Sequence, residues 1–247
     1  MKKISILTLS LALSMGLANA AIVLQDDAVF MDGGKDTLTD AEIGGLDVTS
    51  GDKLVVTIGL EGDDSGPDST VTYNGQNMTL AVENTPTSWA GWVGMYYLDD
   101  ISTVGAGTLD FTNGGYSAGV SFMVLSGTAA GVGNVNSADA TTLNLNVSAN
   151  SFMVAAFGDT ADADVTVDSP LQTLLDVDTD SGFNDGSASY GTGYQLISSA
   201  GTATPSFTST TDRPNMVAAE FTAAIPEPST TLLLGVLGSM LLLRRRR

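Results

Sequence analysis

A run of alternating aspartates carries the most specific chemistry in the sequence. Asp176, Asp178 and Asp180 occupy positions 1, 3 and 5 of a short polar segment, and Asp185 follows five residues later. Calcium takes six to eight oxygen ligands, and alternate carboxylates on a tight loop supply several of them. The segment is not an EF-hand, because serine stands at positions 6 and 12, where that loop has glycine and glutamate. Two interpretations stay open: a calcium site, or a solvated acidic turn of the kind that aspartate favours.

Carboxylates are also the main acid–base groups that the chain offers, because it contains no histidine and no cysteine. A Ser-His-Asp triad, a cysteine nucleophile and a zinc held by His or Cys are therefore excluded. A glycosidase of sandwich fold places two carboxylates about 5–10 Å apart. The glutamates stand alone in the sequence, at Glu42, Glu61, Glu83, Glu220 and Glu227. We expect a protein that is not an enzyme, with a carboxylate-based glycan hydrolase as the remaining catalytic alternative.

Two further groups of side chains are of types that contact sugars or ice. Trp89, Trp92, Tyr96 and Tyr97 form the densest aromatic cluster, but their alternation suits core packing better than stacking on sugars. Thr-x-Thr pairs occur at Thr70/Thr72, Thr202/Thr204 and Thr208/Thr210. An ice-binding face needs a flat, regular threonine array, whereas threonine is common in any strand. Three scattered pairs give ice binding only weak support.

The segments that must position these residues have the pattern of short strands. Lys53–Leu60 alternates, and Thr70–Tyr73 and Gln76–Val82 flank an Asn74-Gly75 pair that is typical of a type I′ hairpin turn. Further strands are expected at Trp92–Leu98, Thr108–Thr112, Ala118–Leu125, Thr141–Val147, Ser151–Phe157, Tyr194–Ile197, Ser206–Thr208 and Asn215–Phe221. About ten to twelve short strands predict an all-β domain over residues 21–224, a single antiparallel β-sandwich that is jelly-roll-like. No linker and no repeat of fixed period are evident.

The first 20 residues differ from this body. Lys2 and Lys3 precede an apolar run that ends at Leu17, and Ala18-Asn19-Ala20 places small residues where signal peptidase cleaves. The run is shorter than the about 20 residues of an ordinary spanning helix. We therefore expect residues 1–20 to be a signal peptide, with the secretion machinery and signal peptidase as partners and the body outside the cytoplasm.

The exported body is strongly acidic. Lys35, Lys53 and Arg213 are its only basic residues against 28 Asp and Glu, which gives the body and its junction with the tail a net charge of −25. Such a surface repels nucleic acid, whose affinity depends on Lys and Arg at phosphates, and nucleic-acid binding is excluded. Without cysteine the body has no disulfides, so core packing must hold it together.

The last 23 residues, 225–247, combine three features in order. Pro226, Glu227 and Pro228 come first, an apolar segment runs to Leu243, and the chain ends in Arg244, Arg245, Arg246 and Arg247. The apolar part makes roughly 22 Å of helix at 1.5 Å per residue, short of a hydrocarbon core of about 30 Å. Terminal arginines stay cytoplasmic by the positive-inside rule, which leaves the body outside.

This tail resembles the PEP-CTERM sorting signal in all three parts. The resemblance implies recognition of Pro226, Glu227 and Pro228 by an exosortase, a membrane protease or transpeptidase, with the terminal arginines as cytoplasmic anchor. It also implies transient anchoring in the inner membrane, and then release to the cell surface or extracellular matrix of bacteria that make exopolysaccharide. The same tail is found on some ice-binding proteins. The segment Gly191–Phe221 resembles, in texture, the β-rich domains that often precede such tails.

We expect an exported surface or matrix protein, sorted by an exosortase-type system and associated with exopolysaccharide or biofilm. A calcium-assisted carbohydrate-binding or adhesive module is the alternative, a glycan hydrolase comes third, and ice binding has the weakest pattern. The sequence requires no cofactor, and calcium is the one ion for which it offers a candidate loop.

Overall fold

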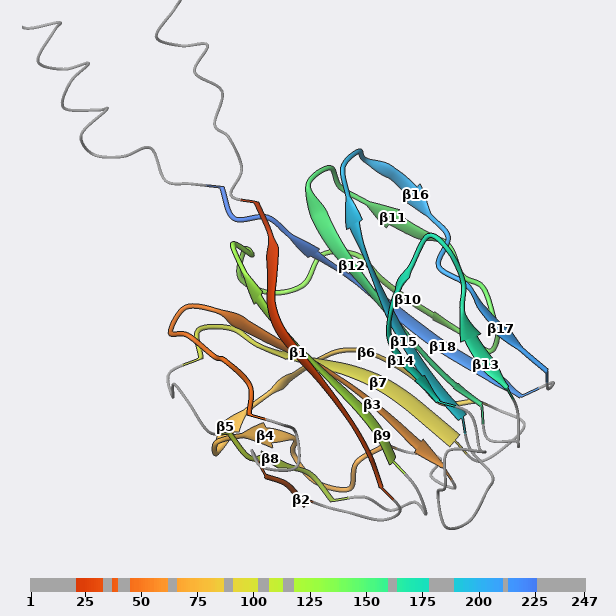
Figure 1. Cartoon of the computed structure of the whole chain (residues 1–247), viewed down its shortest axis with the longest axis horizontal. Coiled ribbons are helices and arrows are strands. Elements are labelled where there is room, and N and C mark those ends of the chain that lie inside the picture. The colour runs from red at the N-terminus through yellow and green to blue at the C-terminus, as the bar shows by residue number, and fades with distance from the viewer. Residues whose placement is uncertain are drawn as a thin grey trace, which may run out of the picture. The chain divides into compact units, whose positions relative to one another are not determined.

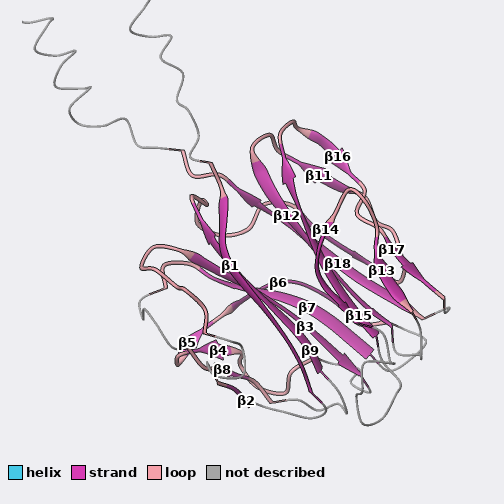
Figure 2. Ribbon diagram, viewed as in Figure 1, coloured by secondary structure: helices cyan, strands magenta, loops and turns pink. Residues whose placement is uncertain are grey.

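The computed structural model describes residues 21–225, with gaps at 33–36, 40–44, 62–65, 87–90, 102–106, 113–117, 160–163, 178–188 and 211–212. Residues 21–223 form one compact unit. The described part is all-β, with several antiparallel sheets (Figure 2). No helix within it is long and apolar enough to cross a membrane. The predicted signal peptide and the helix of the predicted tail lie outside the described residues.

The first half of the chain builds one five-stranded antiparallel sheet, here called the N-sheet (Figure 1). Its strands, in spatial order, are β1 (Val23–Asp32), β9 (Ala118–Ser126), β3 (Lys53–Glu61), β7 (Gly91–Leu98) and β6 (Thr79–Asn84). The central strand β3 is buried on both faces, so it is covered on both sides, and its inner face includes the polar residues Lys53 and Thr57.

The second half builds the other five-stranded antiparallel sheet, the C-sheet. Its strands, in spatial order, are β10 (Val135–Ala138), β18 (Pro214–Thr222), β12 (Ser151–Asp159), β15 (Ser189–Ile197) and β14 (Gln172–Val177). The central strand β12 is buried at every position, so it too is covered on both faces.

Short strands cover the outer faces of both sheets. Over the N-sheet lie β2 (Thr37–Leu38), β8 (Leu109–Asp110), β4 (Thr72–Tyr73) and β5 (Gln76–Asn77). Over the C-sheet, β11 (Leu145–Val147) pairs with β16 (Gly201–Ala203), and β13 (Val165–Val167) pairs with β17 (Phe207–Ser209). Asn74 and Gly75, between β4 and β5, have φ of 49° and 73°, which confirms the predicted hairpin turn.

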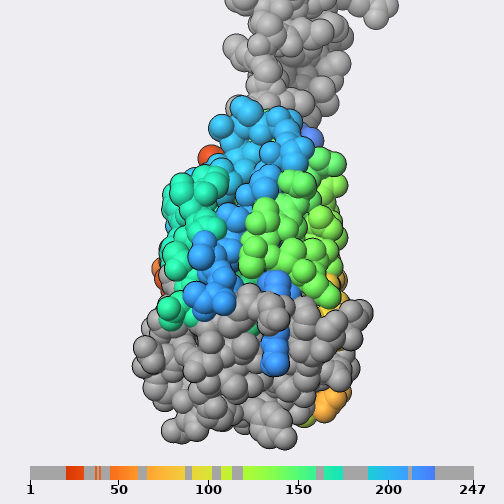
Figure 3. Space-filling view, turned by 90° about the vertical axis from the view of Figure 1, so that its right-hand side faces the viewer, coloured from red at the N-terminus to blue at the C-terminus, as the bar shows by residue number. Residues whose placement is uncertain are grey.

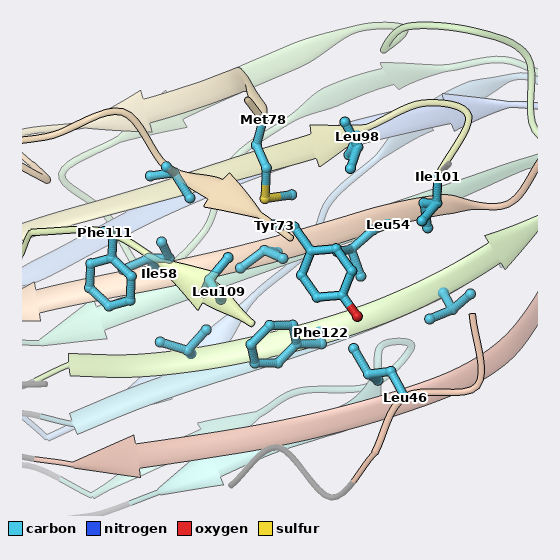
Figure 4. Close-up of a cluster of buried hydrophobic side chains, with 14 of the residues drawn as sticks. Leu46, Leu54, Ile58, Tyr73, Met78, Leu98, Ile101, Leu109, Phe111 and Phe122 are labelled. Atoms are coloured by element: carbon cyan, nitrogen blue, oxygen red, sulfur yellow. The ribbon is translucent and has the colours of Figure 1, made fainter. Parts of the chain in front are cut away.

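Three hydrophobic clusters hold these layers together. One lies between the N-sheet and the C-sheet and joins Val55 and Met123 to Phe152 and Phe221. The other two lie on the outer faces, beneath the short strands, and Figure 4 shows the cluster of the N-sheet. Burial on both faces explains why β12 is a near-continuous apolar run in the sequence.

The two sheets have the same topology. When the five main strands of each half are numbered along the chain, both sheets have the spatial order 1-5-2-4-3. The outer strands repeat as well, because the β2–β8 pairing corresponds to β11–β16 and the β4–β8 pairing to β13–β17. Each sheet therefore comes from one half of the chain, and the domain is an internal structural duplication.

Reciprocal contacts across the core support this duplication. Gly59 of β3 pairs with Val93, and Gly158 of β12 pairs with Tyr190. A Cβ added to Gly59 would lie 2.3 Å from the Tyr190 ring, and one added to Gly158 would lie 2.6 Å from a Val93 methyl group. Thus Tyr190, the partner of Gly158, packs against Gly59, and Val93, the partner of Gly59, packs against Gly158. Such close approach requires a residue without a side chain.

Candidate functional site

An open groove of about 400 Å³ lies beside the turn that joins β15 to β16. Leu196, at 57% exposure, lines the groove, and so do the buried residues Val147 and Ile197. The remaining lining residues are uncharged as well: Pro170, Gln195, Ser198, Ser199, Gly201, Thr202, Ala203 and Thr204. The groove therefore presents hydroxyl, amide and apolar groups, and none of its lining side chains carries a charge.

A second hollow of about 270 Å³ adjoins the groove. Ala21 and Ile22, which lead into β1, line it together with Asn150, and it shares Leu196 and Ser198 with the groove. Its lining side chains are also uncharged. Leu196 thus contributes to both hollows, so the two form one continuous recessed surface at this end of the domain.

Paired amides and hydroxyls extend from the groove along β11 and β16. Thr202 Oγ1 donates a hydrogen bond to Asn146 Oδ1 at 3.3 Å, and Thr204 Oγ1 donates to Asn144 Oδ1 at 2.9 Å. All four side chains are exposed, while the alternate residues between them face the core. We call Asn144, Asn146, Thr202 and Thr204 the amide–hydroxyl ladder. Strands β11 and β16 belong to the face of the molecule that Figure 3 shows in green and blue.

The three Thr-x-Thr pairs of the sequence do not lie in the same sheet. Thr72 belongs to β4, over the N-sheet, whereas Thr202 belongs to β16 and Thr208 to β17. The Thr208 hydroxyl donates to Asp168 Oδ1 at 3.0 Å, so it is engaged by a carboxylate. The structure therefore extends only the Thr202/Thr204 pair into a ladder, and it does so through asparagines of a distant segment.

A buried lysine links the N-sheet to the segment that crosses to the C-sheet. Lys53 is 2% exposed, and its Nζ lies 2.6 Å from Asp99 Oδ1 and donates to the Gly131 carbonyl. Gly131 N–H donates to Asp99 Oδ2 at 2.7 Å. The ammonium also lies 4.9 Å and 5.3 Å from the ring centroids of Tyr97 and Phe221. Burial lowers the pKa of Lys53, and the hydrogen bond and charge of Asp99 oppose that shift.

The same crossing segment is held on its other side by Glu220. This side chain is fully buried, and its Oε1 accepts from the Ser148 N–H. Its Oε2 accepts from the Asn134 N–H at 3.3 Å and from the Asn134 side chain at 3.1 Å. Burial by itself raises the pKa of Glu220, but the hydrogen bonds from Ser148 and Asn134 outweigh it and hold the pKa below its usual value. Glu220 is thus placed as a structural acceptor.

Glu220→Gln should destabilise the protein more at pH 7 than at pH 3. The amide would turn a donor toward N–H groups that now donate to a carboxylate, at a cost of about 1–3 kcal/mol. Because the folded-state pKa is depressed, the stability from this carboxylate is present above the unfolded-state pKa and is lost as pH falls through the folded value. Urea unfolding of the variant and wild type at both pH values measures the difference. Asp164→Asn, at an exposed position, is the matched control, and equal losses at both pH values would contradict the assignment.

Only one of the four predicted calcium ligands belongs to a described part of the backbone. Asp176 lies in β14, so the first position of the predicted loop belongs to a strand. Its side chain and the residues Asp178, Asp180 and Asp185 lie outside what is described. Among the described residues, no group of three or more Asp, Glu, His or Cys could hold a metal ion. The calcium site stays a prediction.

The sorting and cleavage residues also lie outside the described part of the chain. They are Ala18, Ala20, Pro226, Glu227, Pro228, Arg244, Arg245, Arg246 and Arg247. Of the other glutamates, Glu42 is undescribed, and Glu61 belongs to β3 with its side chain undescribed. The predicted roles of the sorting and cleavage residues rest on the sequence pattern.

The aromatic cluster is mainly core, as its alternation predicted. Trp92 is 1% exposed, and its indole N–H donates to Glu83 Oε2 at 3.0 Å. Tyr96 is half-buried against the outer cluster of the N-sheet, where burial and then the charge of Glu83 raise its pKa to about 12. Tyr97 packs on the inner face of the same strand, and Trp89 lies outside the described residues.

Comparisons of the chain with protein-family models, with curated proteins and with solved structures found no match.

Proposed function

We propose that this chain is an exported surface or matrix protein that an exosortase-type enzyme sorts through its C-terminal tail. The observation that carries the proposal is the three-part segment from Ile225 to Arg247, with Pro226, Glu227 and Pro228 as recognition residues. The signal-peptide pattern of residues 1–20 supports the same topology. Anchoring in the inner membrane is transient, and the cell surface or extracellular matrix is the destination.

We also propose a finer classification of the fold, as a single β-sandwich. The N-sheet and the C-sheet, packed through a shared hydrophobic cluster, support a single antiparallel β-sandwich. It is jelly-roll-like in having two packed antiparallel sheets. It departs from a jelly roll in drawing each sheet from one half of the chain.

The domain contacts exopolysaccharide through the groove beside β15 and β16, and its role is binding rather than catalysis. Hydroxyl, amide and apolar side chains line the groove, and these are groups that hold a ligand without transferring protons to it. The buried carboxylate of Glu220 also supports a role other than catalysis, because backbone and side-chain N–H groups engage both of its oxygens.

The intact mass of the protein in each fraction of producing cells tests the sorting proposal. We expect a species that begins near Ala21 and lacks Leu232 to Arg247, recovered from the surface or matrix fraction. A species that retains the four arginines and stays in the inner-membrane fraction would show a tethered periplasmic protein instead. A variant with alanine at Pro226, Glu227 and Pro228 is the control, and it should accumulate unprocessed.

A further inference from the structure

The duplication shows which positions of the two halves correspond. Counting from the matched glycines of β3 and β12, Lys53 corresponds to Phe152, and Tyr97 corresponds to Tyr194. Their contacts correspond too, since the Lys53 ammonium lies 4.9 Å from the Tyr97 ring centroid and the Phe152 and Tyr194 rings stack at 5.1 Å. The correspondence therefore extends to the ends of these strands, where the groove lies.

An ion pair occupies the equivalent place in the first half. By the same count Leu196, which lines the groove, corresponds to Asp99. Asp99 binds both Lys53 and the Gly131 N–H, and this ties the end of β7 to the segment that enters β10. In the second half Leu196 is 57% exposed, and the residue in place of Lys53 is the apolar Phe152. The ion pair has no counterpart there, and an open, uncharged hollow takes its place.

From this difference we infer that the groove and the amide–hydroxyl ladder form one binding site for an uncharged polysaccharide chain. The inference rests on the proposed function and specifies its ligand. The exposed Leu196 offers an apolar surface for the C–H face of a sugar ring. The ladder offers both donors and acceptors for sugar hydroxyls, because amides and hydroxyls have both capacities.

Charge decides between neutral and acidic polysaccharides. The body and its junction with the tail carry a net charge of −25, so an anionic chain is repelled at long range and meets no cation in the groove. A neutral polysaccharide is not repelled by the acidic surface and needs no cation in the groove. The hydrogen bonds of Thr202 to Asn146 and of Thr204 to Asn144 fix the ladder before a ligand arrives, and this reduces the entropy lost on binding.

The test measures binding of the mature protein to neutral glycans (dextran, laminarin, mannan and galactan) and to the polyanion alginate. We expect binding to at least one neutral glycan and weaker binding to alginate. The double variant Thr202→Val/Thr204→Val removes two hydroxyls and keeps the β-branched shape, and it should weaken neutral-glycan binding about tenfold. Leu196→Asp should weaken it as well by bringing a charge into the groove. Thr79→Val, at an exposed threonine of β6, is the matched control.

The outcomes separate this inference from the proposed function. All substituted side chains are exposed, and an unchanged thermal midpoint of each variant shows that the fold is intact. Preference for alginate, binding to none of the neutral glycans, or neutral binding that the double variant leaves unchanged would overturn the inference. If the producer's own polysaccharide is retained equally by wild type and double variant, the sorting proposal stands, and the groove is wrong as the place where the domain contacts exopolysaccharide. The intact-mass measurement decides on sorting independently of either result.

Discussion

Asp99→Ala is expected to destabilise the protein by about 3 kcal/mol or more, because it leaves a buried ammonium without its counter-ion. Lys53 is 2% exposed and would retain only the Gly131 carbonyl and two aromatic faces as partners. Lys53→Met should cost much less. It removes the buried charge, keeps apolar contact with Tyr97 and Phe221, and leaves the Asp99 carboxylate, which is 30% exposed, with water and the Gly131 N–H.

Chemical denaturation of both variants at pH 7 and pH 10 measures these effects. The pKa of Lys53 is lowered by burial, so the cost of the unpaired ammonium is present below the folded-state pKa and disappears as pH rises toward the unfolded value. The deficit of Asp99→Ala should therefore shrink at pH 10. Asp99→Asn keeps one acceptor oxygen without the charge, so its loss of stability should fall between those of wild type and alanine. A loss in Lys53→Met equal to that in Asp99→Ala would show that the ion pair is not the cause.

Gly59→Ala should destabilise the protein by about 1–3 kcal/mol through overpacking. The added methyl group would lie 2.3 Å from two carbons of the Tyr190 ring, and this ring is also held against Gly119, the partner of Gly59 on β9. Gly201→Ala is the matched control, because a Cβ at that position meets nothing within 4 Å. Its effect should be close to zero or slightly stabilising.

A double-mutant cycle shows whether the Tyr190 ring is responsible. Tyr190→Ala alone should cost about 3–5 kcal/mol, because it leaves a cavity between the sheets. Combined with Gly59→Ala it should cost less than the sum of the two single changes, since the methyl group then fills part of that cavity. Additive effects would place the strain of Gly59→Ala elsewhere in β3.

The strands that the sequence predicted are those with the strongest apolar patterns. Strands β3, β7, β9, β12 and β18 were expected close to their observed positions, because their buried apolar residues form either a clear alternation, as in β3, or a dense run, as in β12. Of the strands in the two five-stranded sheets, the missed ones are β1, β10 and β14, which lie at sheet edges, and the short strands β2, β13 and β16 were missed as well. In β1, Asp26 interrupts the apolar pattern, and its carboxylate accepts hydrogen bonds from the Asp27 and Asp47 N–H groups. Such tertiary pairing is not visible in a local pattern.

The sequence indicated only part of the candidate site, because its residues come from distant segments. The Thr202/Thr204 pair was noted in the sequence, but its partners Asn144 and Asn146 lie 56 to 60 residues away, and pairing at that distance depends on the fold. The alternation of leucine and asparagine in that segment was the available signal. The duplication escaped notice because equivalent positions hold unlike residues, as Leu196 and Asp99 do.

The C-sheet determines how the protein would carry mechanical tension. A tether at the C-terminus pulls on β18, which lies between β10 and β12 and is paired with β12 along nine residues. A ligand in the groove pulls on β15 and β16, and β15 is the other neighbour of β12. Ile197 of β15 and Thr222 of β18 both pair with Ser151 of β12, so the two points of load lie at the same end of these three adjacent strands. Tension between them therefore loads the hydrogen bonds one pair after another from that end, rather than all together in shear. The N-sheet lies outside this path, so tension between the tether and the ligand acts on the second half of the chain alone.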